Sequence, residues 1–505
     1  MTSDMRSVVI HGHFYQPPRE DPWTGSIRRQ PSAAPYHDWN ERVAAECYGP
    51  VVASRVIREG EPDRIINSLE WMSFNFGPTL MVWLESHEPG TYAAILEADR
   101  RSAQRLNGHG NAIAMPYHHP ILPLSTERDR RTEIRWGIAD FRRRFGRDPE
   151  GLWLPETAVD GATLDALAGE GILFVVLAPH QVDPVPDDGR PGRYVTSSGK
   201  EIALFAYDGR LSHGVAFGDL LEDGVAWAAL MAGDGVDDGA DAGLPDERAV
   251  ALRSIATDGE TFGHHHTFGE MGLAKAIVEL QNRGHVRIEN YASFLAREGM
   301  GERVNIVEPS AWSCAHGVDR WRADCGCRID PGADTQQAWR RPLREALAWL
   351  ADGLHSVFEE EGRQHFADPW AERDAYGKVV ARMGEMAPNK ADPTGTPSDR
   401  ARELLEMERD ALRLFTSCAW FFDDVGGIEP RQVLAYAAHG LELAGAAGDP
   451  LRAGLVERLR AAVSNDREVG TAADVFEKIA ESRSLAVPDA GAEDAEALSE
   501  GSASR

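Results

Sequence analysis

The sequence predicts an α/β protein in which a seven-stranded parallel (β/α)7 barrel is followed by an α-helical bundle. Up to about residue 300, short apolar segments alternate with longer amphipathic ones, which is typical of parallel strands joined by helical crossovers. Polar residues follow these strand segments at their C-terminal ends, where a closed α/β barrel gathers its functional groups. Beyond about residue 335, apolar residues recur at the i, i+3, i+4 spacing of helices. An open, doubly wound sheet gives a similar alternation and stays open as the second interpretation.

The elements are placed as follows. The seven predicted strands lie at residues 7–11, 64–70, 111–116, 151–155, 172–179, 201–207 and 252–257. We divide the chain into a catalytic barrel (1–304), a linking segment that contributes to the cleft (305–335), a helical bundle (336–482) and an acidic tail (483–505). The tail consists of small, polar and acidic residues, a composition that predicts disorder.

Charge and composition exclude several classes of partner. The chain has 505 residues and a formal net charge of −28, from 81 acidic and 53 basic side chains. This balance repels nucleic acid and anionic membrane surfaces and suits a neutral substrate. No stretch reaches the roughly 18 apolar residues of a membrane span, and the N-terminus has no signal-peptide pattern. We therefore predict a cytoplasmic protein that binds neither nucleic acid nor membranes.

Five cysteines are too few and too scattered for a disulfide framework in a chain of this size. Cys314, Cys325 and Cys327, with His316, could together bind Zn²⁺. The Cys-x-Cys spacing of the last pair is, however, not the usual Cys-x2-Cys spacing of zinc sites. We expect a structural or redox-inert role for these residues, and we predict no metal and no cofactor.

Two carboxylates stand at predicted strand ends. Glu156 follows an apolar strand and Pro155, with Trp153 beside it, so it suits a positioned nucleophile next to an apolar sugar platform. An ordinary surface glutamate at a strand end is the competing interpretation. Asp258 ends the last strand and is followed by Glu260 and by three histidines at 264–266. By itself, this second pattern fits either a proton donor or a metal site.

Histidines and aromatic residues gather at the same strand ends. His11 and His13 are two residues apart on a strand, so both imidazoles face the same side of it. His119 lies at another strand end, next to Pro120. The remaining candidates for sugar binding are Trp71, Trp153, Trp312, Asp208 and His265.

Several of these motifs together resemble glycoside hydrolase family 57. The segments that match are WLPE at 153–156 and, about a hundred residues later, DGETFG at 258–263. The opening HGHFYQPP is similar to the family's His-x-His segment, although Phe14 and Tyr15 are inserted before Gln-Pro. The resemblance spans residues 7 to about 320, and segments such as TSCAWFFDDVGG further resemble a poorly characterised branch with its own C-terminal helices.

The resemblance assigns roles to individual residues. It implies that Glu156 is the nucleophile and Asp258 the general acid/base of a double displacement. His119 occupies a position where members of the family carry Glu or His, and Trp312 is the candidate aromatic residue of the last, looser motif. The histidines would then hydrogen-bond the sugar and help to keep the two carboxyl pKa values apart.

The expected function is a retaining enzyme, hydrolase or transglycosylase, that acts on α-glucan-type oligo- and polysaccharides. Two alternatives stay open. A metal-dependent carbohydrate deacetylase on a related barrel would use Asp258 and clustered histidines for Zn²⁺, but it would leave Glu156 without a role. A non-catalytic carbohydrate-binding protein predicts the loss of one carboxylate, whereas both are present.

Overall fold

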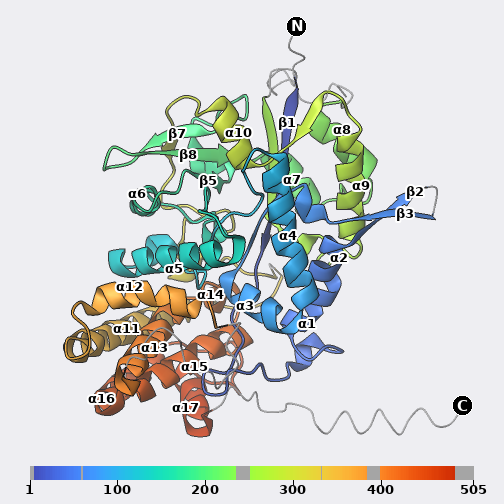
Figure 1. The fold of residues 1–505 in the computed structure, drawn as a ribbon. Helices are drawn as coiled ribbons and strands as arrows, with labels where there is room; N and C mark the ends of the chain where they lie inside the picture. Colours follow the sequence, from blue (N-terminus) through green and yellow to red (C-terminus); the bar gives the residue numbers. More distant parts are fainter. Residues whose placement is uncertain (1–4, 59–60, 235–250, 331, 384–397, 484–505) are drawn as a thin grey trace, which may run out of the picture.

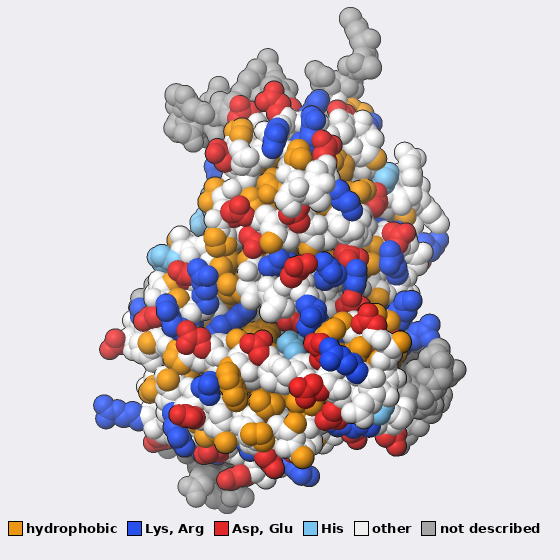
Figure 2. All heavy atoms as spheres, turned by 90° about the vertical axis from the view of Figure 1, so that its left-hand side faces the viewer, with side chains coloured by type: hydrophobic (Ala, Val, Ile, Leu, Met, Phe, Trp, Pro, Cys, Tyr) orange, Lys and Arg blue, Asp and Glu red, His pale blue; other side chains and the backbone are white. Residues whose placement is uncertain are grey.

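The structure, a computed structural model, describes residues 5–58, 61–234, 251–330, 332–383 and 398–483. Strands and their covering helices form one part of the molecule, and the helices from α11 onward pack against one side of it (Figure 1). The predicted disordered tail lies outside the described residues, apart from its first residue. On the face drawn in Figure 2, acidic and basic side chains are interspersed, so the net charge of −28 is not gathered into one patch there.

Strand β1 (Arg6–Phe14) is the centre of the main sheet and is almost wholly buried. It pairs in parallel with β4 (Ser73–Phe76), β9 (Leu252–Asp258) and β10 (Val286–Ile288). A second sheet contains β5 (Phe174–Leu177) and β8 (Glu201–Ala206) in parallel, and β7 (Gly192–Val195) antiparallel to β8. Two short antiparallel pairs complete the set: β2 (Ser54–Arg58) with β3 (Glu61–Ile66), and β6 (Val182–Asp183) with β11 (Asn305–Ile306).

Single parallel bridges join the two larger sheets. Phe74 pairs with Ala112, Ala114 with Leu152, and Gly151 with Phe174. The predicted α/β class is therefore confirmed. Within the described residues, the strands form a four-stranded and a three-stranded sheet linked by these bridges, rather than one continuous seven-stranded sheet.

The predicted strand at 64–70 overlaps an observed strand only in part and is not a strand of the main sheet. Only its first three residues, 64–66, belong to the β2–β3 hairpin, in which the Ile65 side chain is 68% exposed, and residues 68–70 form a 3₁₀ turn. The strand that pairs with β1 comes later, at Ser73–Phe76, where all four residues are buried. A strand-like pattern of apolar residues within one short segment does not specify which segment will pair with β1, because pairing depends on packing against the rest of the sheet. This shift moves Trp71 from a strand's C-terminal end to a position before a strand.

Helices cover the sheets along residues 39–298 (Figure 1). They are α1 (Trp39–Val43), α2 (Gly49–Val52), α3 (Pro78–His87), α4 (Pro89–Arg105), α5 (Glu127–Phe145), α6 (Gly161–Gly169), α7 (Gly209–Ala216), α8 (Gly224–Ala232), α9 (Gly269–Gln281) and α10 (Tyr291–Glu298). Helix α5 begins after Thr126, whose hydroxyl accepts from the Asp129 N–H, and ends at Gly146 in the left-handed conformation.

The C-terminal part of the chain is helical. Its helices are α11 (Arg340–Gly362), α12 (Pro369–Val380), α13 (Asp399–Arg413), α14 (Cys418–Phe421), α15 (Ile428–Leu443), α16 (Gly448–Leu459) and α17 (Ala472–Ser482). They share a hydrophobic core of their own, built on leucines such as Leu343, Leu347 and Leu404. None of the helices that the structure describes is long and apolar enough to cross a membrane.

Helix α5 is where the two parts meet. Its Trp136 is fully buried in the core of the C-terminal helices, and its indole N–H donates to the Arg373 carbonyl oxygen over 2.9 Å. The wholly buried Arg373 guanidinium pairs with Asp129 on α5 at 2.8 Å and with Glu408 on α13 at 2.7 Å. Both apolar and charged contacts therefore hold the C-terminal helices to the sheet-containing part.

Candidate active site

The register of β1 brings polar side chains of three neighbouring strands together. His13 on β1 lies opposite Asp258 at the end of β9 and opposite Asn75 on β4. His11, two residues earlier, lies opposite Ser73 and forms a 3.0 Å hydrogen bond with its hydroxyl. Because these strands are parallel, their C-terminal ends meet at one edge, as the sequence predicted for His11, His13 and Asp258.

A line of hydrogen bonds runs from the sheet to the C-terminal helices. Asn75 Nδ2 donates to His13 Nδ1 over 2.9 Å, so His13 carries its proton on Nε2 and donates to His119 Nε2 over 3.2 Å. His119 then donates from Nδ1 to the Ser417 hydroxyl over 2.6 Å. Burial lowers the pKa of His13 to about 3 and that of His119 well below its usual value. Both rings are therefore neutral.

Aromatic rings support these histidines. The Trp153 ring stacks on His11 and on His13, at 4.8 and 5.1 Å between centroids, and Tyr15 stacks on His119 at 3.8 Å. Trp153 has no exposed surface. The sequence predicted a sugar platform at this position, whereas the structure places the indole behind the histidines, where it fixes their orientation.

Glu156 has a constrained backbone and a constrained side chain. Its φ of 58° lies in the left-handed region, which costs free energy for a residue with a Cβ. Its Oε2 accepts from the Trp312 indole N–H at 3.1 Å and from the Ser313 hydroxyl at 2.5 Å. Burial raises the pKa of the carboxyl, while the hydrogen bonds from Ser313 and Trp312 oppose that rise. The segment around residue 312 thus holds Glu156 in one orientation.

Asp258 is exposed, although its neighbours on β9 are buried. The protein around it nonetheless raises the pKa of its carboxyl well above the usual value, first through loss of hydration and then through the charges of Glu260 and Glu156. These surroundings therefore favour the protonated form of Asp258, while its side chain stays reachable from solvent. The same surroundings act on Tyr207, whose pKa is raised by burial and by the charge of Asp258.

Glu260 belongs to this group, although from the sequence it was named only as a neighbour of Asp258 and given no role of its own. Its carboxylate accepts from the Tyr15 backbone N–H at 2.9 Å and from the Tyr48 hydroxyl at 2.6 Å. Burial raises the pKa of Glu260 to about 7. The signal that could have identified it is its place inside DGETFG, two residues after Asp258.

The C-terminal helices contribute two residues that were also missed. Ser417 donates its backbone N–H to the His119 carbonyl oxygen at 3.1 Å, in addition to accepting from the His119 ring. Cys418, the next residue, packs against the apolar cluster that contains Tyr15 and Trp153. Burial raises the pKa of its thiol, and the charges of Glu429 and Glu156 raise it further. About three hundred residues separate this pair from His119, so only tertiary packing could reveal the contact.

Three of the predicted site residues are not brought to this group. Trp71 precedes β4 and lies under the Arg105 guanidinium, 4.4 Å from the ring centroid. Asp208 caps helix α7 by accepting from the Leu211 N–H at 2.9 Å. His265 is exposed and lines a different pocket of about 600 Å³. Each of these side chains has a contact or pocket of its own outside this group, and a role in sugar binding stays a prediction for all three.

The cysteines that the sequence left unassigned come together in space. Among the described residues, one group of His, Cys, Asp and Glu side chains is close enough to hold a metal ion, namely Cys314, His316, Cys325 and Cys327. Their ligand atoms all lie within 4.8 Å of one another. The strand-end residues His11, His13 and Asp258 do not form such a group. The expectation of an inert role for the cysteines did not anticipate this proximity.

Comparisons with known proteins agree with the family resemblance of the sequence. The sequence model of glycosyl hydrolase family 57 matches residues 96–305, and a domain of unknown function, DUF3536, matches residues 336–499. A curated relative, alpha-amylase 1 of Dictyoglomus thermophilum, is 24% identical over 196 residues, which are 38% of this chain and 26% of that protein. The chain thus spans about a quarter of the length of this relative.

Solved structures show the same fold. An exo-type maltose-forming amylase from Pyrococcus sp. ST04 superposes with a TM-score of 0.70 at 17% identity, covering 91% of this chain and 83% of that one. A family 57 branching enzyme from Pyrococcus horikoshii gives a TM-score of 0.55 at 15% identity, covering 95% and 94%. At such identities the likeness concerns the fold. The sequence match over residues 96–305 makes that part of the chain similar to glycosyl hydrolase family 57.

Proposed function

We propose that the protein is a retaining enzyme acting on α-glycosidic bonds, with Glu156 as nucleophile and Asp258 as general acid/base. The observation that carries the proposal is the different environment of the two carboxyls. Donors from Trp312 and Ser313 oppose the rise that burial causes in the pKa of Glu156, whereas no side-chain donor to Asp258 is found among the described residues and its pKa is held well above the usual value. Two carboxyls whose pKa values are pushed apart are what a nucleophile and an acid require.

The reaction proceeds in two displacements. Glu156 attacks the anomeric carbon while Asp258 gives its proton to the departing glycosidic oxygen, so that a glycosyl-enzyme forms. The Asp258 carboxylate then takes a proton from water, or from a sugar hydroxyl, which attacks the anomeric carbon and releases Glu156. Which acceptor reacts decides between hydrolysis and transglycosylation.

The neutral histidines suit the binding of an uncharged sugar. His11 Nε2 is a buried nitrogen with no hydrogen-bond partner among the described residues, so a sugar hydroxyl is a fitting partner for it. An α-glucan-type substrate is supported by the names of similar proteins, among them amylases, a branching enzyme and a 4-α-glucanotransferase. We assign this substrate class to the chain on the basis of that similarity.

We further propose that seven strand segments close into a (β/α)7 barrel. The segments, in order, are β1, β4, residues 112–114, residues 151–152, β5, β8 and β9. Support comes from the parallel bridges and from one backbone hydrogen bond, Asp208 N–H to Ser254 carbonyl oxygen at 2.7 Å, between the end of β8 and β9. We also propose that the chain consists of a catalytic barrel (1–304), a segment that completes the cleft (305–335) and a helical bundle (336–482).

The deacetylase alternative is less well supported. It requires histidines and Asp258 to converge on one metal ion, and the part of the chain that the structure describes has no such convergence at the strand ends. It also gives no task to Glu156 and its two donors. A screen on maltooligosaccharides, starch and glycogen, with acetylated oligosaccharides alongside, separates the two activities. Release of acetate without cleavage or transfer of glucosyl units would overturn the glycosidase proposal.

Asp258→Asn provides the direct test of the acid/base. With a substrate whose leaving group needs little protonation, we expect the glycosyl-enzyme to form, and its hydrolysis to be slowed by about 10²–10⁴-fold, because no base activates water. Added azide needs no base and should restore turnover as a glycosyl azide of retained configuration. Asp352→Asn, an exposed position on α11, is the control. A variant that azide cannot rescue would remove Asp258 from this role.

Ser313→Ala should move the acid limb of the pH–rate profile to higher pH. The nucleophile reacts as a carboxylate, and the Ser313 hydrogen bond is the first of the contacts that oppose the rise in the pKa of Glu156. Without it, Glu156 holds its proton to higher pH, so kcat/KM falls earlier on acidification. The profile of Ser356→Ala, an exposed serine on α11, should match the wild type. An unmoved acid limb in Ser313→Ala would contradict the assignment of that limb to Glu156.

A further inference from the structure

The segment that carries Trp312 and Ser313 has little regular structure of its own. Its described residues, 305–330 and 332–335, contain the two-residue strand β11 and one short 3₁₀ turn, Asp319–Trp321. Such a long connection normally needs some additional constraint to hold one conformation. Yet two of its side chains contact Glu156 directly, so its conformation matters for the site.

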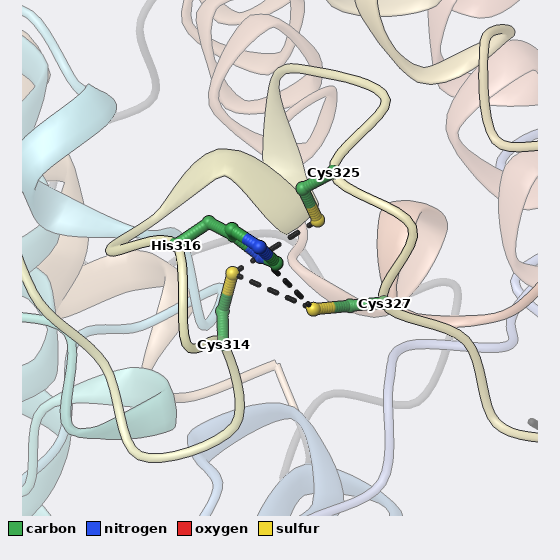
Figure 3. A group of neighbouring side chains, drawn as sticks. All are labelled: Cys314, His316, Cys325 and Cys327. Atoms are coloured by element: carbon green, nitrogen blue, oxygen red, sulfur yellow. Dashed lines mark hydrogen bonds between the residues drawn. The ribbon is translucent and has the colours of Figure 1, made fainter.

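Four side chains of this segment converge on one point (Figure 3). The Sγ atom of Cys314 lies 4.0 Å from that of Cys325 and 3.9 Å from that of Cys327, and Cys327 Sγ lies 3.6 Å from His316 Nδ1. A tetrahedral Zn²⁺, with Zn–S of about 2.3 Å and Zn–N of about 2.0–2.1 Å, requires about 3.8 Å between two sulfurs and about 3.6 Å between sulfur and nitrogen. These three distances are close to those of a four-coordinate zinc site, and all four ligand atoms lie within 4.8 Å of one another.

The distances argue against a disulfide. A disulfide brings two sulfurs to about 2.05 Å, whereas here one sulfur is nearly equidistant from two others. A set of three thiolates and one imidazole in tetrahedral arrangement selects zinc among the common metal ions. His316 is exposed, and Cys325 and Cys327 are partly so, which leaves the cluster accessible to a metal ion from solution.

Backbone and charge around the cluster also fit an ion. Gly326, between the last two cysteines, has a φ of 78°, a left-handed turn that lets both flanking sulfurs face the same point although they are only two residues apart. The buried Arg340 guanidinium donates to the Cys327 carbonyl oxygen at 2.8 Å, and the buried Arg320 donates to that of Ser313 at 3.2 Å. Zn²⁺ with three thiolates and a neutral imidazole carries one net negative charge, which these cations stabilise.

We propose that Cys314, His316, Cys325 and Cys327 bind one Zn²⁺ as a structural site. Binding replaces three thiol protons with bonds to the ion, so three protons are released and no redox change occurs. With four protein ligands no coordination position is open for substrate, which distinguishes a structural from a catalytic zinc. This assignment replaces the prediction from the sequence that the chain binds no metal.

The proposed zinc ligand Cys314 is directly bonded in the chain to Ser313, a residue of the candidate active site. Cys314 follows Ser313, the residue whose hydroxyl bonds to Glu156. Fixing the Cys314 sulfur therefore fixes the position of Ser313 and, next to it, Trp312. This second part of the inference rests on the proposed function, whereas the presence of zinc does not.

Metal analysis of the full-length protein, purified without chelator or affinity metal, tests the site directly. We expect about one zinc per chain, and less than a tenth of that in Cys325→Ser/Cys327→Ser. His316→Cys should retain the metal, because four cysteines also form a structural zinc site. Cys47→Ala, which removes a buried thiol far from the cluster in sequence, is the control and should keep its zinc.

Cobalt gives a second, spectroscopic readout. Protein unfolded with chelator and refolded with Co²⁺ should show the visible bands of tetrahedral cobalt and the near-ultraviolet absorption of thiolate–cobalt bonds, and the double serine variant should show neither. A full-length protein without zinc, or one whose zinc content is the same in the double variant, would overturn the site. So would a disulfide between any two of Cys314, Cys325 and Cys327 found by mass spectrometry of the native protein.

The link to Glu156 has its own readout. If the folded double variant keeps glycoside activity, its acid limb should shift in the same direction as that of Ser313→Ala, since both loosen the same hydrogen bond. An unshifted limb in a zinc-free, folded variant would leave the zinc site standing and refute its effect on Glu156. Absence of activity in the wild type would count against the proposed function alone, because metal content does not depend on it.

Discussion

Glu156→Gln should reduce turnover by on the order of 10³-fold or more, because it replaces the nucleophile by an amide that cannot form the glycosyl-enzyme. The amide is nearly isosteric, and its oxygen can still accept from Trp312 and Ser313. The left-handed backbone is also kept, since it belongs to the position rather than to the carboxylate. We therefore expect a folded protein of near-normal thermal stability. Initial rates on a maltooligosaccharide, with melting curves of both proteins, check this.

The Glu156→Gln result needs a control with the same substitution at a position outside the site. Glu150→Gln lies six residues earlier, where the carboxylate pairs with His109 away from the strand ends, and it should leave the rate unchanged. Substrate binding by Glu156→Gln, measured by calorimetry, should persist. Near-normal rates in Glu156→Gln would instead show that another group attacks the anomeric carbon.

A chain that ends after residue 300 should be insoluble or inactive. Truncation exposes Trp136, which is now fully buried among the C-terminal helices, and leaves Asp129 without Arg373. Exposed apolar surface of this kind promotes aggregation. It also deletes Trp312 and Ser313, which hold the Glu156 carboxylate. We expect activity below detection even if some protein remains in solution.

The control for this truncation is a chain that ends at residue 483, which keeps every helix that the structure describes. It should match the full-length protein in solubility and rate. Soluble fractions, size-exclusion profiles and initial rates of the two truncated chains provide the comparison. A soluble, fully active fragment of residues 1–300 would show that the C-terminal helices are a separate module.

The residues that could be predicted are those whose surroundings are local in sequence. His11 and His13 share a strand face, and Asp258 ends a strand, so the direction of the strands alone brings them to one edge. Glu156 was singled out by its motif and by the apolar strand before it, and its role as nucleophile stays a proposal. The α/β class followed from the same alternation of short and long apolar segments.

The residues that could not be predicted depend on contacts between distant segments. Ser417 reaches His119 across about three hundred residues, and no local pattern encodes that contact. Trp71 was assigned to the cleft because its strand was placed at 64–70, whereas the sheet uses Ser73–Phe76. From the sequence we expected no metal at the proposed zinc ligands, because Cys-x-Cys is not the usual spacing of a zinc site. The sequence does not show that Gly326, between the two cysteines, adopts a left-handed conformation.

The hydrogen-bond line from Asn75 to Ser417 has a direction, and this has a consequence for how such proteins can diverge. Each imidazole in it accepts on one nitrogen and donates on the other, so the tautomer of His13 and the identity of residue 417 are mutually dependent. If a different helical region had no hydrogen-bond acceptor at position 417, the Nδ1–H of His119 would be left without a partner. We therefore expect the sheet-containing part and its C-terminal helices to be inherited together. A chimaera that joins this sheet-containing part to other C-terminal helices should need a hydroxyl side chain at the position of Ser417.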